Sequence, residues 1–244
     1  MILRDHPVFT PPPDEAVKVW RYLDLAGFVS LLSSRSLFFR RADKFRDRLE
    51  GSFSRANLRM RPEVYQAWEE EHRQIAFTQM AAAAQRVRSH VYINCWHMSE
   101  RESAGMWDAY AGSNLGIAIQ STYSRLIGTL EENETGIYAG VVNYIDYEQD
   151  WMPEGNLFYP FVYKDLSFQH ERELRCLIPP ADMRGQPPYE VGWNVEVDMQ
   201  RLIENVVIAP YAQPWFTDVV ESLIEKYDVN IPVRTSILGI DPVF

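Results

Sequence analysis

The chain is organised around residues 95–110, which read Cys95-Trp-His-Met-Ser-Glu-Arg-Glu-Ser-Ala-Gly-Met-Trp-Asp-Ala-Tyr110. No other stretch holds so many chemically distinctive residue types so close together. Residues 91–96, at its start, are apolar, β-branched and aromatic, which is typical of a short buried strand. The pattern that follows predicts a helix. We therefore expect a cleft at the junction of these two elements.

Capping signals indicate where this helix begins and ends. Ser99 and Glu102 have the spacing of a capping box, and Gly112 is expected to end the helix. On this prediction Trp96 and His97, with Met98, lie on a strand-to-helix loop. An indole, an imidazole and a helix N-terminus would then face one cavity.

The composition of the 244-residue chain favours one large folded domain. Hydrophobic residues make up 46% of it and aromatic residues 13%, enough for a substantial core. No apolar run approaches the roughly 20 residues that cross a bilayer, and no signal-peptide pattern is found, so we expect a cytoplasmic protein with no membrane partner. Cys95 and Cys176 lie in apolar runs and are expected to be buried free thiols. Cys95 near His97 resembles a nucleophile pair, but so apolar a run should raise the pKa of the thiol.

The charge of the chain is distributed unevenly. A net charge of −10 disfavours a general nucleic-acid binder, yet residues 35–61 hold nine basic residues against three acidic ones. Such a basic segment suits one phosphate-bearing ligand or a short stretch of nucleic acid. It is equally typical of a solvated surface, because arginine and lysine are mostly exposed.

Patterning along the rest of the chain predicts an α+β fold. Strands and helices mix without regular alternation, which favours a mixed, largely antiparallel sheet with flanking helices and a long helical insertion, in a single domain over residues 1–244. Residues 1–13 are expected to form an extended arm, and Pro62 to open a helical insertion or lid over residues 62–89. Strands are predicted over residues 20–22, 36–40, 115–120, 140–147, 174–178, 191–197, 206–209 and 233–238, and helix starts at Asp24, Ser121 or Thr122, Asp198 and Pro214.

A second polar segment surrounds residue 170. If Glu173 opens a strand, Glu173 and Arg175 point to one face, so that a carboxylate and a guanidinium share a pocket. Lys164, His170 and Glu171 precede them closely in the sequence. The alternative is an ion-pair network that joins this segment to the arginine-rich one. The common phosphate-loop, dinucleotide, zinc, redox and serine-elbow motifs are absent from the sequence.

Segments spread over nearly the whole chain carry a family resemblance. They include Trp20-Arg21-Tyr22, Ala42-Asp43-Lys44-Phe45-Arg46-Asp47-Arg48-Leu49-Glu50-Gly51, Asn94-Cys95-Trp96-His97-Met98, Val142-Asn143-Tyr144-Ile145-Asp146-Tyr147 and residues 168–175. On these segments the sequence resembles the bacterial family called the domain of unknown function 2971. That name carries no established activity, so the resemblance implies positions rather than a chemistry.

The order of parts is also similar to that of ADP-ribosyltransferase-like enzymes, which use NAD. The similarity implies that a glutamate on a late strand stabilises the ribosyl cation, that aromatic rings hold nicotinamide and that arginines neutralise phosphate. A fixed carboxylate suits this chemistry, because departure of nicotinamide builds positive charge on the ribose. From all of these patterns together, the candidate catalytic residues are Glu173, Glu171 and His97, and the candidate ligand-binding residues are Arg21, Tyr22, Arg40, Asp43, Arg46, Asp47, Glu50, Trp96, Trp107, Tyr110, Lys164, His170 and Arg175.

This hypothesis makes NAD the substrate, with no metal, and the protein an ADP-ribosyltransferase or NAD glycohydrolase that fits bacterial defence or a toxin system. Its partners would be a small nucleotide ligand and a protein or nucleic-acid acceptor. One alternative is a Mg²⁺-dependent nuclease or phosphodiesterase, whose oxygen ligands would come from Asp43, Asp47, Glu50, Glu171 and Glu173. Another is a non-catalytic sensor of a nucleotide or nucleic acid. Magnesium dependence separates the two enzymes, and turnover separates either from the sensor.

Overall fold

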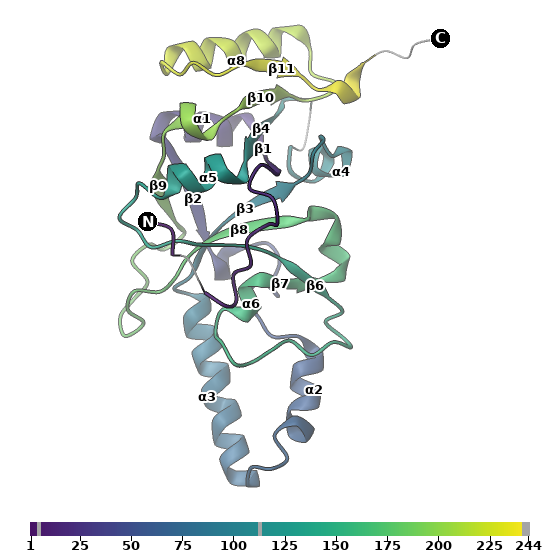
Figure 1. Cartoon of the computed structure of the whole chain (residues 1–244), viewed down its shortest axis with the longest axis vertical. Helices are drawn as coiled ribbons and strands as arrows, with labels where there is room; N and C mark the ends of the chain where they lie inside the picture. Colours follow the sequence, from purple (N-terminus) through teal and green to yellow (C-terminus); the bar gives the residue numbers. More distant parts are fainter. Residues whose placement is uncertain (4–5, 112–113, 241–244) are drawn as a thin grey trace.

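The computed structural model describes residues 1–3, 6–111 and 114–240 of the chain. It is an α+β domain built on a mixed, mostly antiparallel sheet, as the patterning predicts. Figure 1 shows the sheet in the upper part of an elongated molecule and a helical hairpin at its lower end. Among the described residues, no helix has both the length and the apolar character needed to cross a membrane.

The strands form one large sheet and one small one. The large sheet contains β1 (Lys18–Asp24), β2 (Ser36–Arg41), β3 (Tyr92–Met98), β4 (Gly116–Thr122), β5 (Tyr138–Val141), β8 (Glu173–Ile178), β9 (Gly192–Glu196), β10 (Asn205–Ile208) and β11 (Val233–Thr235), and the small sheet pairs β6 (Asn143–Ile145) with β7 (Tyr163–Asp165).

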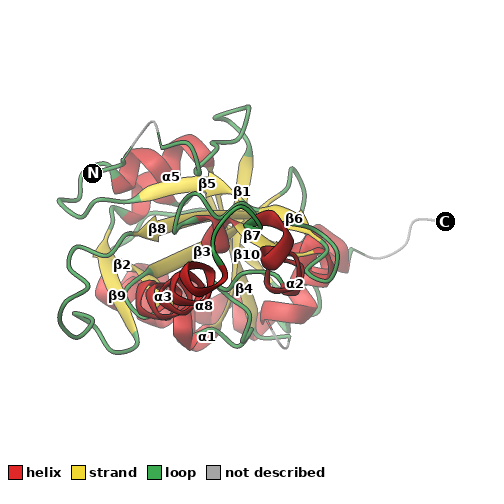
Figure 2. Cartoon of the chain, turned by 90° about the horizontal axis from the view of Figure 1, so that it is seen from below, coloured by secondary structure: helices red, strands yellow, loops and turns green. Residues whose placement is uncertain are grey.

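Helices lie on both sides of these strands (Figure 2). They are α1 (Leu25–Ser34), α2 (Arg55–Val64), α3 (Glu70–Arg88), α4 (Ala104–Met106), α5 (Tyr123–Leu130), α6 (Tyr159–Val162), α7 (Met199–Leu202) and α8 (Pro214–Lys226). Shorter turns are the 3₁₀ segments Ala42–Lys44, Leu166–Glu171 and Ile237–Gly239 and the π-helical turn Trp107–Ala111.

Strand β3 connects the parts of the large sheet. One edge of β3 pairs with β8 along its length, from Tyr92 opposite Ile178 to His97 opposite Glu173. The other edge is shared by two strands, because Trp20 of β1 pairs with His97 whereas β2 pairs with the opposite end of β3. The sheet therefore divides along this edge into a β1-β4-β10-β11 part and a β2-β9 part.

Asn94 lies on β3 between the residues that pair with β1 and those that pair with β2. Its side-chain Nδ2 donates to the carbonyl of Phe38 on β2 at 2.9 Å, and its Oδ1 accepts from the indole Nε1 of Trp96 at 2.7 Å. Both Asn94 and Trp96 are 1% exposed. The amide side chain thus satisfies polar groups that strand pairing leaves open at this point.

Hydrophobic clusters cover both faces of the sheet, as alternation along each strand requires. The main core collects one face of β3 and β8 with α1, α5 and α8, and it includes Trp96 and Leu174. The other face of the same strands packs Ile93 and Leu177 against Phe161 of α6. Glu173 and Arg175 belong to this second face, because they alternate with Leu174 along β8.

The segment after β3 differs from the prediction. Trp96, His97 and Met98 are part of the strand, because pairing with β1 and β8 extends β3 through them. The helix begins only at residue 104, where Ser103 is the N-cap, so the capping box of Ser99 and Glu102 is wrong. The Glu102 carboxylate instead binds residues near the C-terminus. Gly112 lies outside the described residues.

The helical stretch expected from Pro62 is two helices. Ser54 caps α2, and Pro62 lies within the last turn of that helix rather than at its start. The chain turns over residues 65–69 before α3 begins. The predicted strand over residues 140–147 is likewise divided between β5 and β6, in two different sheets. The caps at Asp24, Thr122 and Asp198, and the start of α8 at Pro214, are confirmed.

Replacing Asn94 by leucine should lower the free energy of unfolding by about 2–4 kcal/mol, because each buried group left without a partner costs about 1–3 kcal/mol. The groups left are the Phe38 carbonyl and the Trp96 indole N–H. Urea unfolding measures the loss. The same substitution at exposed Asn230 is the control and should change stability by less than about 0.5 kcal/mol. Equal losses in the two variants would contradict the bridging role.

Candidate active site

A buried cluster of charged side chains lies where β8 begins. Lys164 reaches into it from β7, and its Nζ lies 2.6 Å from Oε1 of Glu173. The Nε of Arg175 lies 2.5 Å from the other oxygen of Glu173. Both oxygens of this carboxylate are therefore held by cations. The prediction that Glu173 and Arg175 share one face is confirmed.

Arg175 joins β8 to the arginine-rich segment. Its two terminal nitrogens bind the two oxygens of Glu50 at 2.6 and 2.9 Å, in the forked geometry typical of arginine with a carboxylate. It also donates to the carbonyl of Phe161 at 2.8 Å and is completely buried. The next residue, Gly51, helps to position Glu50. Its φ is +69°, and a Cβ at this position would overlap the ring of Phe161, so any residue other than glycine is disfavoured here.

Glu171 is the third carboxyl group of the cluster. Lys164 binds one of its oxygens, and the hydroxyl of Tyr110 donates to the other. The backbone carbonyl of Glu171 lies 2.6 Å from Nδ1 of His97, so this ring nitrogen carries a proton. Tyr144, which the sequence analysis did not single out, accepts the backbone N–H of Glu173 at 2.8 Å. It lies in one of the segments that carry the family resemblance.

The cluster holds three carboxyl groups against two cations, and their pKa values separate. Burial, together with the hydrogen bond and repulsion from Glu173, raises the pKa of Glu171 to about 7. Burial would also raise the pKa of Glu173, but Arg175, Glu171 and Lys164 outweigh it and hold that pKa well below its ordinary value. Near neutral pH, Glu173 is therefore ionised while Glu171 exchanges a proton. Opposed carboxyl pKa values of this kind are typical of acid–base sites.

His97 and Cys95 point to the same face as the cluster, because β3 continues through both. Burial lowers the pKa of His97 and raises the pKa of Cys95 well above its ordinary value, as expected for the thiol. A cysteine nucleophile is therefore disfavoured. The ring of Tyr22 packs edge-on against His97 and Trp107, and its hydroxyl accepts the backbone N–H of Ser103 at 2.9 Å.

Several predicted ligand-binding residues lie elsewhere. Arg21 and Trp96 point to the opposite face of the sheet from Glu173, and Nη1 of Arg21 is buried with no hydrogen-bond partner in the described part of the chain. The remaining residues are near the surface or bound locally: Arg40, Arg46 and His170 are exposed, Asp43 pairs with Arg41 at 2.6 Å, and Asp47 accepts the backbone N–H of Leu49 at 2.9 Å.

The polar groups of this site are arranged for proton transfer and charge stabilisation. Within residues 1–3, 6–111 and 114–240, no group of three or more His, Cys, Asp or Glu side chains is arranged to hold a metal ion. What the cluster offers is an ionised carboxylate beside a protonatable one, linked by Lys164.

The chain matches no protein-family model and no curated protein, so membership of the domain of unknown function 2971 family is not shown. Its fold is similar to solved structures of DarT from Thermus sp. 2.9. The complex with NAD⁺ has 7% sequence identity and a TM-score of 0.41, over 91% of this chain and 96% of that one. The complex with ADP-ribosylated ssDNA has 8% identity and a TM-score of 0.42, over 95% and 97%. Likeness at this level concerns the path of the chain and not its activity.

Replacing Arg175 by methionine should destabilise the fold by about 3–5 kcal/mol, because it leaves buried Glu50 without its cation and Glu173 with Lys164 alone. Chemical unfolding measures the loss. Adding Glu50→Gln to this variant should recover part of it, since the uncompensated charge is removed. Arg40→Met, at an exposed position, is the control and should cost less than about 0.5 kcal/mol. Similar losses at both arginines would mean that Arg175 is not what holds the carboxylates.

Glu171 should make stability depend on pH. Its folded pKa, about 7, exceeds the ordinary value of 4.5, so the folded state binds more protons between these values. The free energy of unfolding should therefore fall as pH rises from about 4.5 to 7. Glu171→Gln should reduce this fall, with any remainder coming from Glu50, whose pKa burial also raises, whereas Glu221→Gln on the exposed face of α8 should leave it unchanged. Urea titrations across this range test it, and an unchanged fall in the Glu171 variant would contradict it.

Proposed function

We propose that the chain is an ADP-ribosyltransferase-like enzyme that breaks the N-glycosidic bond of NAD, either as a transferase or as a glycohydrolase. The observation that carries this proposal is the pair of neighbouring glutamates with opposed pKa values. Glu173 is held ionised by Lys164 and Arg175, whereas Glu171 gains and loses a proton near pH 7. Such a pair can stabilise positive charge at a sugar carbon and accept a proton from the group that attacks it.

In this mechanism the bond between C1′ of the ribose and the nicotinamide nitrogen breaks, and its electron pair leaves with nicotinamide. Positive charge develops on the ribose beside the ionised Glu173, where a buried environment strengthens the attraction. The acceptor or water then adds to C1′ and gives its proton to Glu171, whose pKa suits a general base at neutral pH. Lys164 contacts both carboxylates and fixes their relative position. His97 positions Glu171 through its backbone carbonyl.

The ligand would reach the carboxylates from the side of Tyr110. This side chain is 48% exposed while its hydroxyl binds Glu171, so its ring connects the surface with the buried pair. An aromatic ring there suits stacking on nicotinamide. Protein, nucleic acid or water would be the acceptor, and a bacterial defence or toxin role would use such chemistry.

The nuclease hypothesis has weaker support. Among the residues that the structure describes, the candidate ligands do not form a group of three or more that could hold a metal ion, and Arg41 binds Asp43. The sensor hypothesis differs from ours in a measurable way. It requires that NAD bind without turnover and that Glu173→Gln leave binding intact.

The test is release of nicotinamide from NAD by the purified protein, with and without cell lysate as a source of acceptor, in EDTA and in Mg²⁺. We expect release that survives EDTA and falls by at least about 100-fold in Glu173→Gln, because the ribosyl cation loses its counter-charge. Below pH 7, the wild-type rate should rise with pH as Glu171 loses its proton. Glu171→Gln should be slow and lose this rise.

The matched control is Asp43→Asn, which neutralises a carboxylate outside the cluster and should retain turnover. Folding of every variant is checked by circular dichroism. No release of nicotinamide under any of these conditions, or equal release by Glu173→Gln and the wild type, would refute the proposal.

A further inference from the structure

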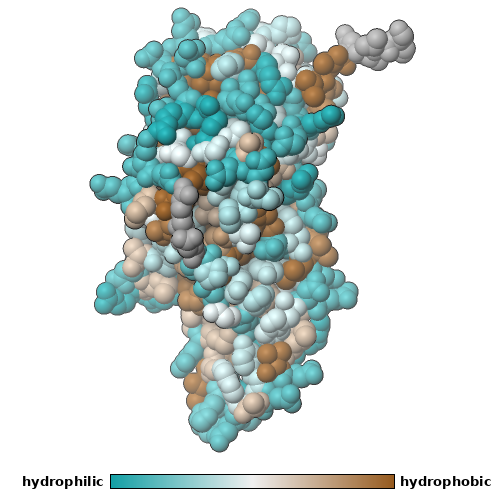
Figure 3. Space-filling model, viewed as in Figure 1, coloured by the Kyte–Doolittle hydropathy of each residue, from teal (hydrophilic) through white to brown (hydrophobic). Residues whose placement is uncertain are grey.

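The hairpin of α2 and α3 projects from the body of the molecule with little to pack against (Figure 1). Helix α3 has 19 residues, of which only Val87 at its base is buried. A helix of this length gains most of its stability from packing rather than from intrinsic propensity. Apolar side chains are nevertheless exposed along the hairpin, among them Leu58, Val64 and Ile75, and Figure 3 shows brown patches at the lower end of the molecule. The indole of Trp68 is exposed as well.

Helix α3 has two different sides. The partly buried residues recur at helical spacing and face α2 and the body: Arg73, Ala76, Phe77, Met80, Ala83, Ala84 and Val87. The opposite side is a second stripe, which we call the free stripe, formed by Glu71, Ile75, Thr78, Ala82, Gln85 and Arg86. All six of these residues are exposed. The free stripe runs from an acidic end near the tip to a basic end near the body.

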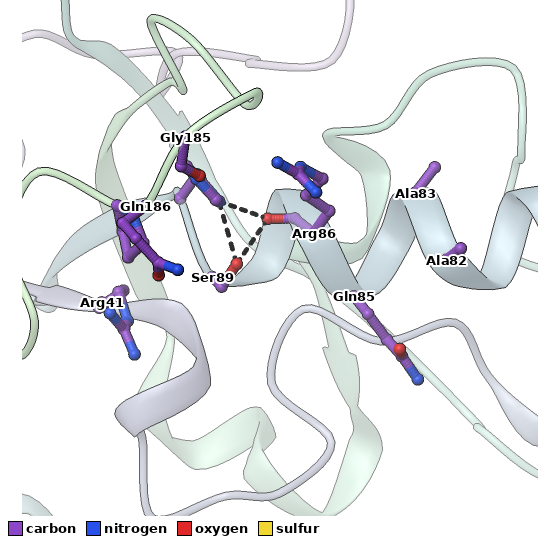
Figure 4. Close-up of a pocket in the computed structure, with 10 residues that line it drawn as sticks. Arg41, Ala82, Ala83, Gln85, Arg86, Ser89, Gly185 and Gln186 are labelled. Carbon is purple, nitrogen blue, oxygen red and sulfur yellow. Dashed lines mark hydrogen bonds between the residues drawn. The ribbon is translucent and has the colours of Figure 1, made fainter.

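A pocket of about 610 Å³ lies at the basic end of this stripe. Figure 4 shows Ala82, Ala83 and Arg86 of α3 on one side of it, with Gly185 and Gln186 on the loop opposite. Two of the helix residues that line the pocket, Ala82 and Ala83, have small side chains. The tip of the hairpin carries a large side chain and acidic residues instead. The indole of Trp68 is 46% exposed there, and three glutamates follow it in the sequence, Glu69, Glu70 and Glu71.

We propose that the free stripe of α3 binds the free stripe of a second copy of this chain, with the two helices antiparallel about a two-fold axis. A two-fold interface requires a surface that complements itself. When Glu71 of one copy lies opposite Arg86 of the other, the same register puts Ile75 opposite Ala82. The bulky side chain then meets the small one, and both contacts occur twice.

Trp68 precedes α3, which begins at Glu70, so it is not part of the helical register; the antiparallel arrangement brings the tip that carries it toward the pocket end of the other copy. An indole in a pocket lined by Ala82 and Ala83 is the kind of buried aromatic anchor that dominates interface energetics. Within the described residues, no ion pair occupies Glu71, so its carboxylate is available to the second copy's Arg86. Arg86 is exposed, and although its Nε donates to the carbonyl of Met183, its terminal nitrogens can still bind a carboxylate. The charges and the shapes thus select the same antiparallel pairing.

Charge exchange between copies tests this register. Glu71→Arg alone and Arg86→Glu alone each place like charges together at both ends and should weaken self-association at least about tenfold. Mixing the two variants should restore it. In the mixed dimer one copy carries arginine and the other carries glutamate at both positions, so both contacts join opposite charges. The double variant Glu71→Arg/Arg86→Glu is the stricter test, because its copies have opposite charges at both contacts only in the antiparallel register. The double variant should recover the wild-type affinity.

Sedimentation equilibrium of the full chain measures the association of each single variant and of the double variant. Both positions are exposed, and circular dichroism checks that each variant is folded. A double variant that associates no better than the single ones would refute the proposed pairing of the two helices.

A cross-link gives a second readout. Thr78 lies next to the two-fold axis in this register, so Thr78→Cys should form an intermolecular disulfide on mild oxidation. Glu221→Cys, on the exposed face of α8, is the control and should not. A wild-type protein that stays monomeric up to about 1 mM, the limit of weak specific association, would refute the proposal.

Discussion

The fully buried guanidinium of Arg175 is the group on which the site depends. It is bound by Glu173 within its own strand, by Glu50 from a distant segment and by a backbone carbonyl of α6. A charge in this position is favourable only when every donor finds an acceptor, because desolvation of an unpaired ion costs several kcal/mol. One arginine therefore fixes where the arginine-rich segment, α6 and β8 meet, and the carboxylates take their positions from it.

The sheet imposes the second constraint. Strand β3 pairs with β8 along one edge, and with β1 and β2 at the two ends of its other edge. Its seven residues therefore contact three other strands. Alternation along β3 and β8 then sorts their side chains. Trp96 and Leu174 enter the main core, whereas His97 and Glu173 face the charged cluster. A shift of one residue in this register would exchange the two faces, so core packing also determines which groups can meet in the site.

Local signals in the sequence predict most of the strands and several helix caps, because these depend on neighbouring residues. They predict that Glu173 and Arg175 share a face for the same reason. They fail at Ser99 and Glu102, where the spacing of a capping box is present but strand pairing extends β3 and Glu102 binds Arg234 instead. The alternative of an ion-pair network between this segment and the arginine-rich one is confirmed by Arg175 and Glu50, which are 125 residues apart. Distance in sequence hides only which two residues form the pair. The role of Tyr144 has no local signal at all.

The number of carboxyl groups distinguishes a purely structural cluster from a functional one. Two cations are balanced by two carboxylates, and Glu50 and Glu173 already meet that need around Arg175 and Lys164. Glu171 is a third carboxyl in the same buried volume, where it is neutral at low pH and adds an uncompensated charge above pH 7. An ion-pair network that served stability alone would be improved by its removal. Its hydroxyl partner, Tyr110, is the member of the cluster that reaches the surface. A surplus acid beside an exposed aromatic ring is thus the feature that structural stability does not explain and that proton transfer to or from a ligand does.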